Sequence, residues 1–204
     1  TGGLGGLGLR AAAMLVQTGA SGIALSSRSG RVGGRAIDAA KGALVRVAAC
    51  DVGDAADALA LLACAASTSV LHAAGVLHDK MLRSMAPSDA HAVFAPKALG
   101  AWPVHTIAMS TPLEAFCLFS SVASTFGNVG QANYAGANAY LDALARSWRC
   151  HGALVSSLQI PAVSGAGMGA ATFDTEQLDA MGAISLDDFA TCLSAALTPA
   201  RAAT

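Results

Sequence analysis

The chain opens on Thr1-Gly2-Gly3-Leu4-Gly5-Gly6-Leu7-Gly8, a glycine-rich stretch that runs into a predicted helix over 6–18. Within it, glycines 3, 5 and 8 form the pattern Gly-x-Gly-x-x-Gly. Glycines let the backbone turn tightly and approach a pyrophosphate, whose charge is met by the N-terminus of the following helix. The pattern alone is weak evidence, because a glycine loop without a ligand has the same composition. Its place directly before a helix favours a dinucleotide site.

Outward from this stretch, the sequence alternates between short apolar strands and longer helical segments. Expected strands cover 22–27, 43–49, 69–71, 116–120 and 154–159. Expected helices cover 55–66, 88–109 (one helix or two, broken at Pro96 and Pro103) and 132–150, with 175–197 mostly helical. This alternation predicts an α/β fold of the Rossmann type, a doubly wound parallel sheet with helices on both faces. Ligands of such sheets bind beyond the carboxyl ends of the strands.

Residues 1–204 are expected to form a single domain that is incomplete at both ends. The first strand is truncated to Thr1, and we expect the last strand to be missing after the final helix. The composition is 54% hydrophobic and only 12% charged, which fits a domain partly covered by neighbours. A net charge of −1 without any basic run argues against nucleic acid and anionic membranes as partners.

Several other classes of protein are disfavoured. Residues 58–77 carry no Asp, Glu, Lys or Arg, but alanine dominates them and Ser67-Thr68-Ser69 interrupts them, so no membrane span is predicted. The five cysteines form no Cys-x-x-Cys pair, and an odd number in apolar runs indicates free thiols and no metal site. No targeting segment is recognised, and a cytoplasmic location is expected.

Two further positions bear on the choice of cofactor. Arg28 ends the second strand twenty residues after Gly8, where a free ribose would call for Asp or Glu and a 2′-phosphate calls for Arg. An ordinary surface charge is the alternative for Arg28. Asp51 and Val52 end the next strand, where the carboxylate can accept from an adenine amino group or cap a helix instead.

Three more segments carry groups suited to catalysis: Lys97, Ser121 at the end of a buried strand, and Tyr134 with Asn138. Tyr134 and Asn138 are four residues apart, so they share one face of a helix. Each residue alone has a structural explanation, such as a cap, packing or a solvated charge. Together they form a pattern.

That pattern, with its surroundings, resembles the ketoreductase domains of modular polyketide synthases over nearly the whole chain. TGGLGGLG, SSRSG, CDVGD, HAAGVLHD, PKALGAW, FSSVAS, GQANYAGANAYLDAL and GMGA occur in the family's order and spacing. The resemblance implies reduction of a β-ketoacyl thioester, held on an acyl carrier protein by phosphopantetheine, with NADPH as cofactor. Other domains of the same synthase would be its partners. Free-standing short-chain reductases place Lys, not Asn138, four residues after the tyrosine.

The resemblance also implies the roles of individual residues. Lys97, Ser121, Tyr134 and Asn138 would be catalytic. The cofactor would contact Thr1, Gly2, Gly3, Leu4, Gly5, Gly6, Leu7, Gly8, Ser27, Arg28, Asp51, Val52, His72, Ala73, Ala74 and Gly75.

The chemistry asks for such groups independently of the resemblance. Hydride attack on a ketone develops negative charge on its oxygen, which hydroxyl groups can stabilise. Tyr134 can then supply the proton, and a nearby Lys97 ammonium is expected to lower its pKa from about 10. Asn138 would orient these groups or hold a relay water.

On the substrate side, the resemblance points to Asp79, Phe126, Gln131 and Met168, with 165–185 as a lid. Asp79 ends a Leu77-His78-Asp79 stretch similar to a Leu-Asp-Asp motif of members that form the D alcohol, although His78 departs from it. Members of the opposite type carry Trp at the position of Phe126. A D-β-hydroxy product is therefore expected, unless Asp79 only caps the following turn.

Two other functions stay open from the sequence. One is a stand-alone reductase of small ketones, against which Asn138 and the chain ends argue. The other is a non-catalytic NADPH-binding or structural module, against which the complete set of four catalytic residues argues.

Overall fold

The structure is a computed structural model that describes residues 1–33, 42–65, 68–108 and 113–197. Its strands are β1 (Gly22–Ser27), β2 (Leu44–Ala49), β3 (Ser69–His72), β4 (Ala115–Ser121) and β5 (Val155–Ile160). All their pairings are parallel: β1 with β2, and β4 with β3 on one side and β5 on the other. This confirms the predicted parallel α/β class.

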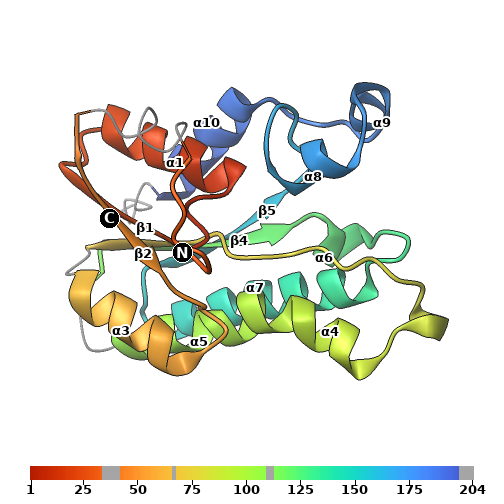
Figure 1. Cartoon of the computed structure of the whole chain (residues 1–204), viewed down its shortest axis with the longest axis horizontal. Helices are drawn as coiled ribbons and strands as arrows, with labels where there is room; N and C mark the ends of the chain where they lie inside the picture. The colour runs from red at the N-terminus through yellow and green to blue at the C-terminus, as the bar shows by residue number, and fades with distance from the viewer. Residues whose placement is uncertain (34–41, 66–67, 109–112, 198–204) are drawn as a thin grey trace.

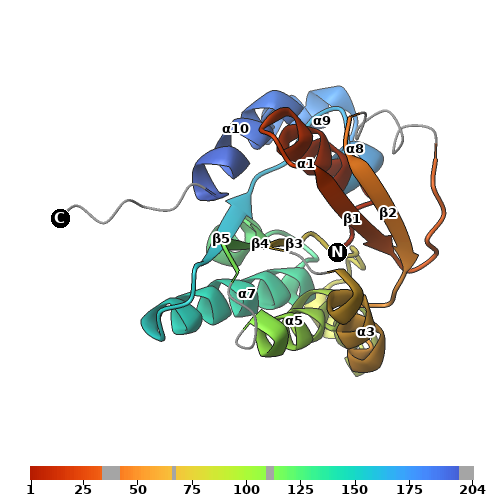
Figure 2. The same cartoon turned by 90° about the vertical axis from the view of Figure 1, so that its left-hand side faces the viewer.

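Helices cover both faces of the strands (Figures 1 and 2). One face carries α1 (Gly6–Gln17) and α10 (Leu186–Leu197), and the other carries α3 (Ala55–Ala65), α4 (Pro87–Phe94), α5 (Gly100–Ala108) and α7 (Ala132–Cys150). Shorter elements are the 3₁₀ turn η1 (Leu82–Ser84), the π-helical turn η2 (Ala95–Leu99), α6 (Ala123–Phe126), α8 (Gly167–Thr172) and α9 (Thr175–Ala180). Among the described residues, no helix is long and apolar enough to cross a membrane.

Each face of the sheet has its own apolar core. Phe116 of β4 stacks on Trp148 of α7, with ring centroids 5.5 Å apart. On the opposite face Phe119 of β4 meets Phe189 of α10 edge-on, at 5.6 Å. β4 is thus buried on both faces, as expected for a central parallel strand, and its carboxyl end is a rigid place for Ser121.

The segment expected as one or two helices over 88–109 is instead three elements, and its last residue lies outside the described part of the chain. α4 passes into the π-helical turn η2 at Pro96, because proline cannot donate to the preceding turn and its ring pushes that turn open. Pro103 lies inside α5 and does not end it. The short helices α6 and α8 were not expected from the sequence.

Residues 1–3 lie between the two groups of strands. The Gly3 amide donates to the Ser26 carbonyl of β1 at 2.9 Å. On the other side, the Thr1 amino group donates to Leu71 O at 2.7 Å, and the Ala73 amide donates to Thr1 O at 2.9 Å. The spatial order is therefore β2, β1, residues 1–3, β3, β4, β5. The prediction that a final strand is missing concerns the chain after α10, and residues 198–204 lie outside the described residues.

Beside residues 1–3, a cavity of about 620 Å³ lies between β1 and β3. Its lining includes Leu15, Leu25, Val70 and Phe119. The Thr1 amino group is buried beside it, and burial lowers its pKa to about 6. An apolar strand extended from Thr1 could pack against the apolar side chains of this lining.

We therefore expect that fusing five alternating valine and isoleucine residues to Thr1 raises the melting temperature by about 4 °C or more. Each buried side chain contributes roughly 1.5–3 kcal/mol, ordering each backbone residue costs about 1–2 kcal/mol, and 1 kcal/mol shifts Tm by about 2–4 °C at this size. A fusion of five glycine and serine residues removes the same buried charge and serves as the control. Equal melting temperatures for the two fusions, followed by circular dichroism, would contradict the strand-sized gap.

Candidate active site

A cavity of about 520 Å³ lies beyond the carboxyl ends of the strands. Its lining contains most of the residues that the sequence singled out: Gly2, Gly5, Gly6, Leu7, Gly8, Ser27, Arg28, Asp51, Val52, Ala73, Ala74, Gly75, Lys97, Ser121, Gln131, Tyr134 and Met168. Those that do not line it are Thr1, Gly3, Leu4, His72, Asp79, Phe126 and Asn138. Eight segments that are separated along the sequence thus meet around one space.

The glycine loop turns the N-terminus of α1 toward this cavity. Gly2 has a φ of +67°, and a Cβ there would come within 2.6 Å of the Ala74 amide nitrogen, so only glycine lets the loop pack on the end of β3. The N-cap Gly5 provides no side-chain acceptor for the first turn. Free amide groups at a helix N-terminus fit the negative charge of a pyrophosphate, and the loop is therefore able to hold a dinucleotide.

The next two positions lie at the mouth of the cavity. Arg28 is exposed directly after β1. Asp51 uses Oδ1 to accept from the Gly53 amide at 3.0 Å. The interpretation of Asp51 as a helix cap is wrong, because the amides of Ala56 and Asp57 both donate to Asp54 Oδ1 instead. Asp51 keeps its place in the cavity wall.

His72 is fully buried below the cavity. Its Nδ1 lies 2.8 Å from Thr1 Oγ1, and its Nε2 lies 2.8 Å from the Lys97 carbonyl oxygen. Burial lowers the pKa of the ring to about 3. The neutral histidine therefore connects Thr1 to the η2 turn, which carries Lys97.

Lys97 reaches the cavity from the η2 turn and is only 3% exposed. Its Nζ donates to Phe119 O at 2.9 Å and lies 5.2 Å from the centroid of the Tyr134 ring. Gly75 makes room for it, since a Cβ there would come within 2.8 Å of Lys97 Cε. Burial lowers the Lys97 pKa to about 8.

Tyr134 stands beside Ser121 and Asn138. Burial raises the pKa of Tyr134, and hydrogen bonds with the Asn138 and Ser121 side chains lower it by less. The expected lowering of this pKa by Lys97 is wrong, because Nζ is bonded to Phe119 O and lies over the ring. The hydroxyl therefore keeps its proton at neutral pH, as a proton donor requires.

Asn138 holds the helix behind Tyr134. Its Nδ2 donates to the Tyr134 carbonyl at 2.8 Å, and Ser120 Oγ donates to the Asn138 carbonyl at 3.3 Å. The side chain is fully buried, yet its Oδ1 has no partner among the described residues. Asn138 therefore has one unused hydrogen-bond acceptor next to Tyr134. Burying such an acceptor without a partner costs about 1–3 kcal/mol of stability.

The depressed pKa of Lys97 has a consequence for stability. Folding shifts it from 10.5 to about 8, so the folded state resists protonation. This penalty is complete below about pH 8 and disappears as the pH rises toward the unfolded value, where both states are neutral. Lys97→Met should therefore raise the free energy of unfolding near neutrality, by up to about 3 kcal/mol, and by little near pH ~10. Thermal melts of both proteins across this range measure it, and a gain that grows with pH would contradict the assignment.

The substrate side of the cavity has a different character. Gln131 is buried in the wall and donates from Nε2 to Asp79 Oδ2 at 2.8 Å. The alternative, that Asp79 caps the following helical turn, is wrong, because the N-cap residue of η1 is Met81 and no side chain caps that turn. Asp79 accepts from Gln131 instead. Phe126 is 83% exposed and does not line the cavity, so the structure does not bring it together with the other predicted substrate residues.

The segment 165–185 contains α8 and α9, and several of its residues line the cavity. Met168 lines the cavity, and so do Phe173 and Met181, which the sequence analysis missed because single apolar residues carry no distinguishing pattern. No group of three potential metal ligands occurs in the part of the chain that the structure describes.

Known proteins are similar to this chain in sequence and in fold. The chain is 40% identical over 218 residues to the spectinabilin polyketide synthase system protein NorB of Streptomyces orinoci, covering 99% of this chain and 10% of that protein. It is also 40% identical over 182 residues to the hybrid PKS-NRPS synthetase pyvA of Aspergillus violaceofuscus, covering 86% and 5%. The chain thus spans a small part of these large relatives.

Solved structures agree with the sequence relatives. The structure titled "Structure of A-type Ketoreductases from Modular Polyketide Synthase" matches with a TM-score of 0.87 and 35% identity, over 97% of this chain and 44% of that one. A second, "The first ketoreductase of the tylosin PKS", matches with a TM-score of 0.84 and 34% identity, over 95% and 44%. The family model described as "KR domain" matches residues 1–165. The chain belongs to the KR domain family, the ketoreductases of polyketide synthases.

Proposed function

We propose that this chain reduces a β-ketoacyl thioester to a β-hydroxyacyl thioester with NADPH during polyketide or fatty acid assembly. The observation that carries the proposal is the joint placement of Ser121, Tyr134 and Lys97 around one cavity whose far end is the uncapped N-terminus of α1. A cavity with phosphate-binding amides at one end and hydroxyl donors at the other suits a nicotinamide nucleotide facing a ketone.

The residues divide the chemistry between them. Bound NADPH supplies the hydride that attacks the ketone carbon. Tyr134 and Ser121 direct their hydroxyl groups at the ketone oxygen and stabilise the charge that develops there. Tyr134 gives its proton to that oxygen as general acid. Lys97 lies over the ring and donates to Phe119 O, which holds the ring in place. Asn138 Oδ1, an acceptor without a partner among the described residues, would orient a water able to return the proton.

The choice of NADPH over NADH rests on Arg28. A guanidinium at the end of β1 is in the place where the adenosine ribose of a dinucleotide lies in this fold. A 2′-phosphate there would accept charge-assisted hydrogen bonds from it. The remaining wall, Asp51 and Val52, is suited to the adenine ring.

The substrate is proposed to arrive on the phosphopantetheine arm of an acyl carrier protein, with other domains of the same synthase as partners. Support comes from the relatives, which are multidomain synthases many times longer than this chain. Segment 165–185 would act as the lid over the substrate.

The experiment is a direct assay. Purified protein is mixed with NADPH and the β-ketoacyl thioester of pantetheine, and the nicotinamide absorbance is followed. The expected result is protein-dependent oxidation of NADPH with formation of the β-hydroxyacyl thioester. Binding of NADPH without oxidation would identify a non-catalytic module, and equal rates with small ketones that lack the thioester arm would identify a stand-alone reductase.

The configuration of the product is a separate prediction. Asp79, fixed to Gln131 beside the cavity, would guide the pantetheine arm to one end of the groove, so that one face of the ketone meets the nicotinamide. We expect the D-β-hydroxy product, measured by chiral chromatography of the released acid. A predominantly L product would show that Asp79 does not set the face.

A further inference from the structure

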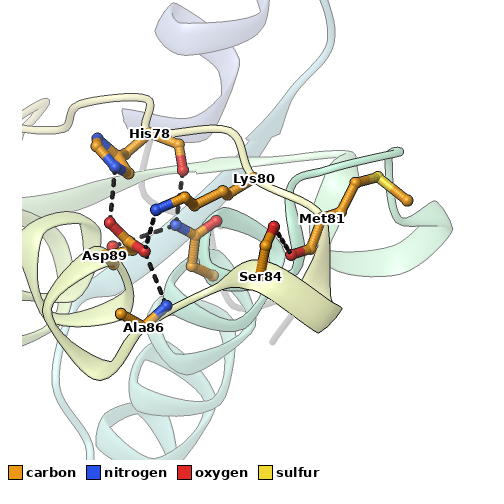
Figure 3. Close-up of polar contacts among 7 residues, drawn as sticks. His78, Lys80, Met81, Ser84, Ala86 and Asp89 are labelled. Atoms are coloured by element: carbon orange, nitrogen blue, oxygen red, sulfur yellow. Dashed lines mark hydrogen bonds and ion pairs between the residues drawn. The ribbon is translucent and has the colours of Figure 1, made fainter.

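The segment between β3 and η1 carries three consecutive polar residues, His78, Asp79 and Lys80. Asp79 contacts Gln131 in the cavity wall at 2.8 Å. His78 and Lys80 both contact Asp89 of α4, as Figure 3 shows. One residue of the segment thus faces the wall of the site, and its two neighbours are held by a single carboxylate.

Asp89 uses both of its carboxylate oxygens for this contact. Oδ1 lies 2.9 Å from His78 Nε2, and Oδ2 accepts from Lys80 Nζ and from the Ala86 amide, both at 2.8 Å. The Asp89 side chain is 11% exposed, whereas those of His78 and Lys80 are 50% and 42% exposed. The hydrogen bond from Lys80, followed by that from the Ala86 amide, lowers the Asp89 pKa to about 2. Asp89 is therefore a largely buried anion on α4, and the half-exposed side chains of His78 and Lys80 both contact it.

Backbone contacts connect the same segment to the catalytic helix. Asn133 donates from Nδ2 to the carbonyl oxygens of His78 and Asp89, at 2.9 and 3.2 Å, and its Oδ1 accepts from the Tyr134 amide at 2.9 Å. The Lys80 amide donates to Gly130 O at 2.7 Å. The segment is thus tied to the beginning of α7 next to Tyr134, and Asp89 adds the side-chain anchor.

We propose that Asp89 is a positioning residue: by holding His78 and Lys80 on either side of Asp79, it fixes the contact of Asp79 with Gln131, which lines the cavity, and so governs binding of the acyl substrate. The inference rests on the proposed function. Asp89 itself does not line the cavity, and its side chain contacts His78, Lys80 and the Ala86 amide, none of which is a catalytic group. Its loss should therefore raise KM for the thioester and spare the hydride-transfer step.

The test uses Asp89→Asn, which keeps an acceptor for the Ala86 amide but removes the charge that holds Lys80 and His78. We expect KM for a β-ketoacyl pantetheine thioester to rise about 5- to 10-fold, with kcat and the Kd of NADPH within about twofold of the unaltered protein. Lys80→Met, at a half-exposed position that does not threaten folding, should raise KM by less. The double variant should be little worse than Asp89→Asn, because both changes remove the same contact.

Asp188→Asn is the matched control. Asp188 is likewise a carboxylate near the start of a helix that accepts from a preceding amide, Ser185 N at 3.2 Å, but it belongs to α10. Its KM should be unchanged. An unaltered KM in Asp89→Asn, or equal losses in kcat and in NADPH affinity, would overturn the inference.

A second readout does not need activity. Lys80 and the exposed Arg83 are trypsin sites in the anchored segment. Asp89→Asn should be cleaved there several-fold faster under native conditions than Asp188→Asn, since cleavage follows local opening. Equal cleavage rates for the two variants would overturn the inference, whether or not the protein is active. Failure of the unaltered protein to reduce the thioester would overturn only the proposed function.

Discussion

Replacing Tyr134 by phenylalanine is expected to lower kcat for thioester reduction by roughly 10²–10⁴-fold, the usual contribution of a general acid. The hydroxyl is the proton donor, and its raised pKa keeps it protonated at neutral pH. Phenylalanine keeps the ring under Lys97 and the packing of α7. The affinity for NADPH should therefore change little.

Steady-state kinetics and NADPH titration by fluorescence measure the two quantities on the same preparation. Tyr140, also on α7, gives the control Tyr140→Phe, because its ring packs on Phe94 and does not line the cavity. Turnover of Tyr134→Phe similar to that of the control would exclude Tyr134 as the acid.

The second large effect is expected at Arg28. Arg28→Ala should weaken NADPH binding by roughly 10- to 150-fold, since a hydrogen bond to a charged group contributes about 1.5–3 kcal/mol. NADH has no 2′-phosphate, so its affinity should be almost unchanged. The preference between the two cofactors would then nearly vanish.

Arg83→Ala removes an equally exposed arginine away from the cavity and controls for net charge. Titration of each protein with both cofactors gives four affinities to compare. If the unaltered protein prefers NADH, or if Arg28→Ala weakens both cofactors equally, the 2′-phosphate contact is wrong.

The sequence predicted the fold well where the signal was local. The glycine spacing of residues 1–8 and the alternation of apolar strands with helices placed β1 and α7 at the residues where the structure has them. The segment around Pro96 was harder, because a proline in a helical pattern can kink, break or open the turn. The structure shows that Pro96 opens the turn into the π-helical η2, from which Lys97 reaches Phe119 O.

For the site, the sequence predicted which residue types are present but not the direction of their pKa shifts. Lys97 and Tyr134 were identified from their spacing, but the direction of the Tyr134 pKa depends on burial and on where Nζ points, which are properties of the packed molecule. His72 lies in a motif of the cofactor wall, yet it bonds to Thr1, a contact between chain segments 71 residues apart. The Asp89 anchor escaped notice for the same reason, since it joins α4 to a separate loop.

The most direct test of the account follows the hydride. NADPH carrying deuterium at the transferable C4 position is incubated with the purified protein and the β-ketoacyl pantetheine thioester, and the product is analysed by mass spectrometry. The account predicts one deuterium on the β-carbon of the hydroxyacyl product, at a rate that Tyr134→Phe lowers as described above. A β-hydroxyacyl product without deuterium, or no product although NADPH binds, would contradict the assignment of this cavity as a ketoreductase active site.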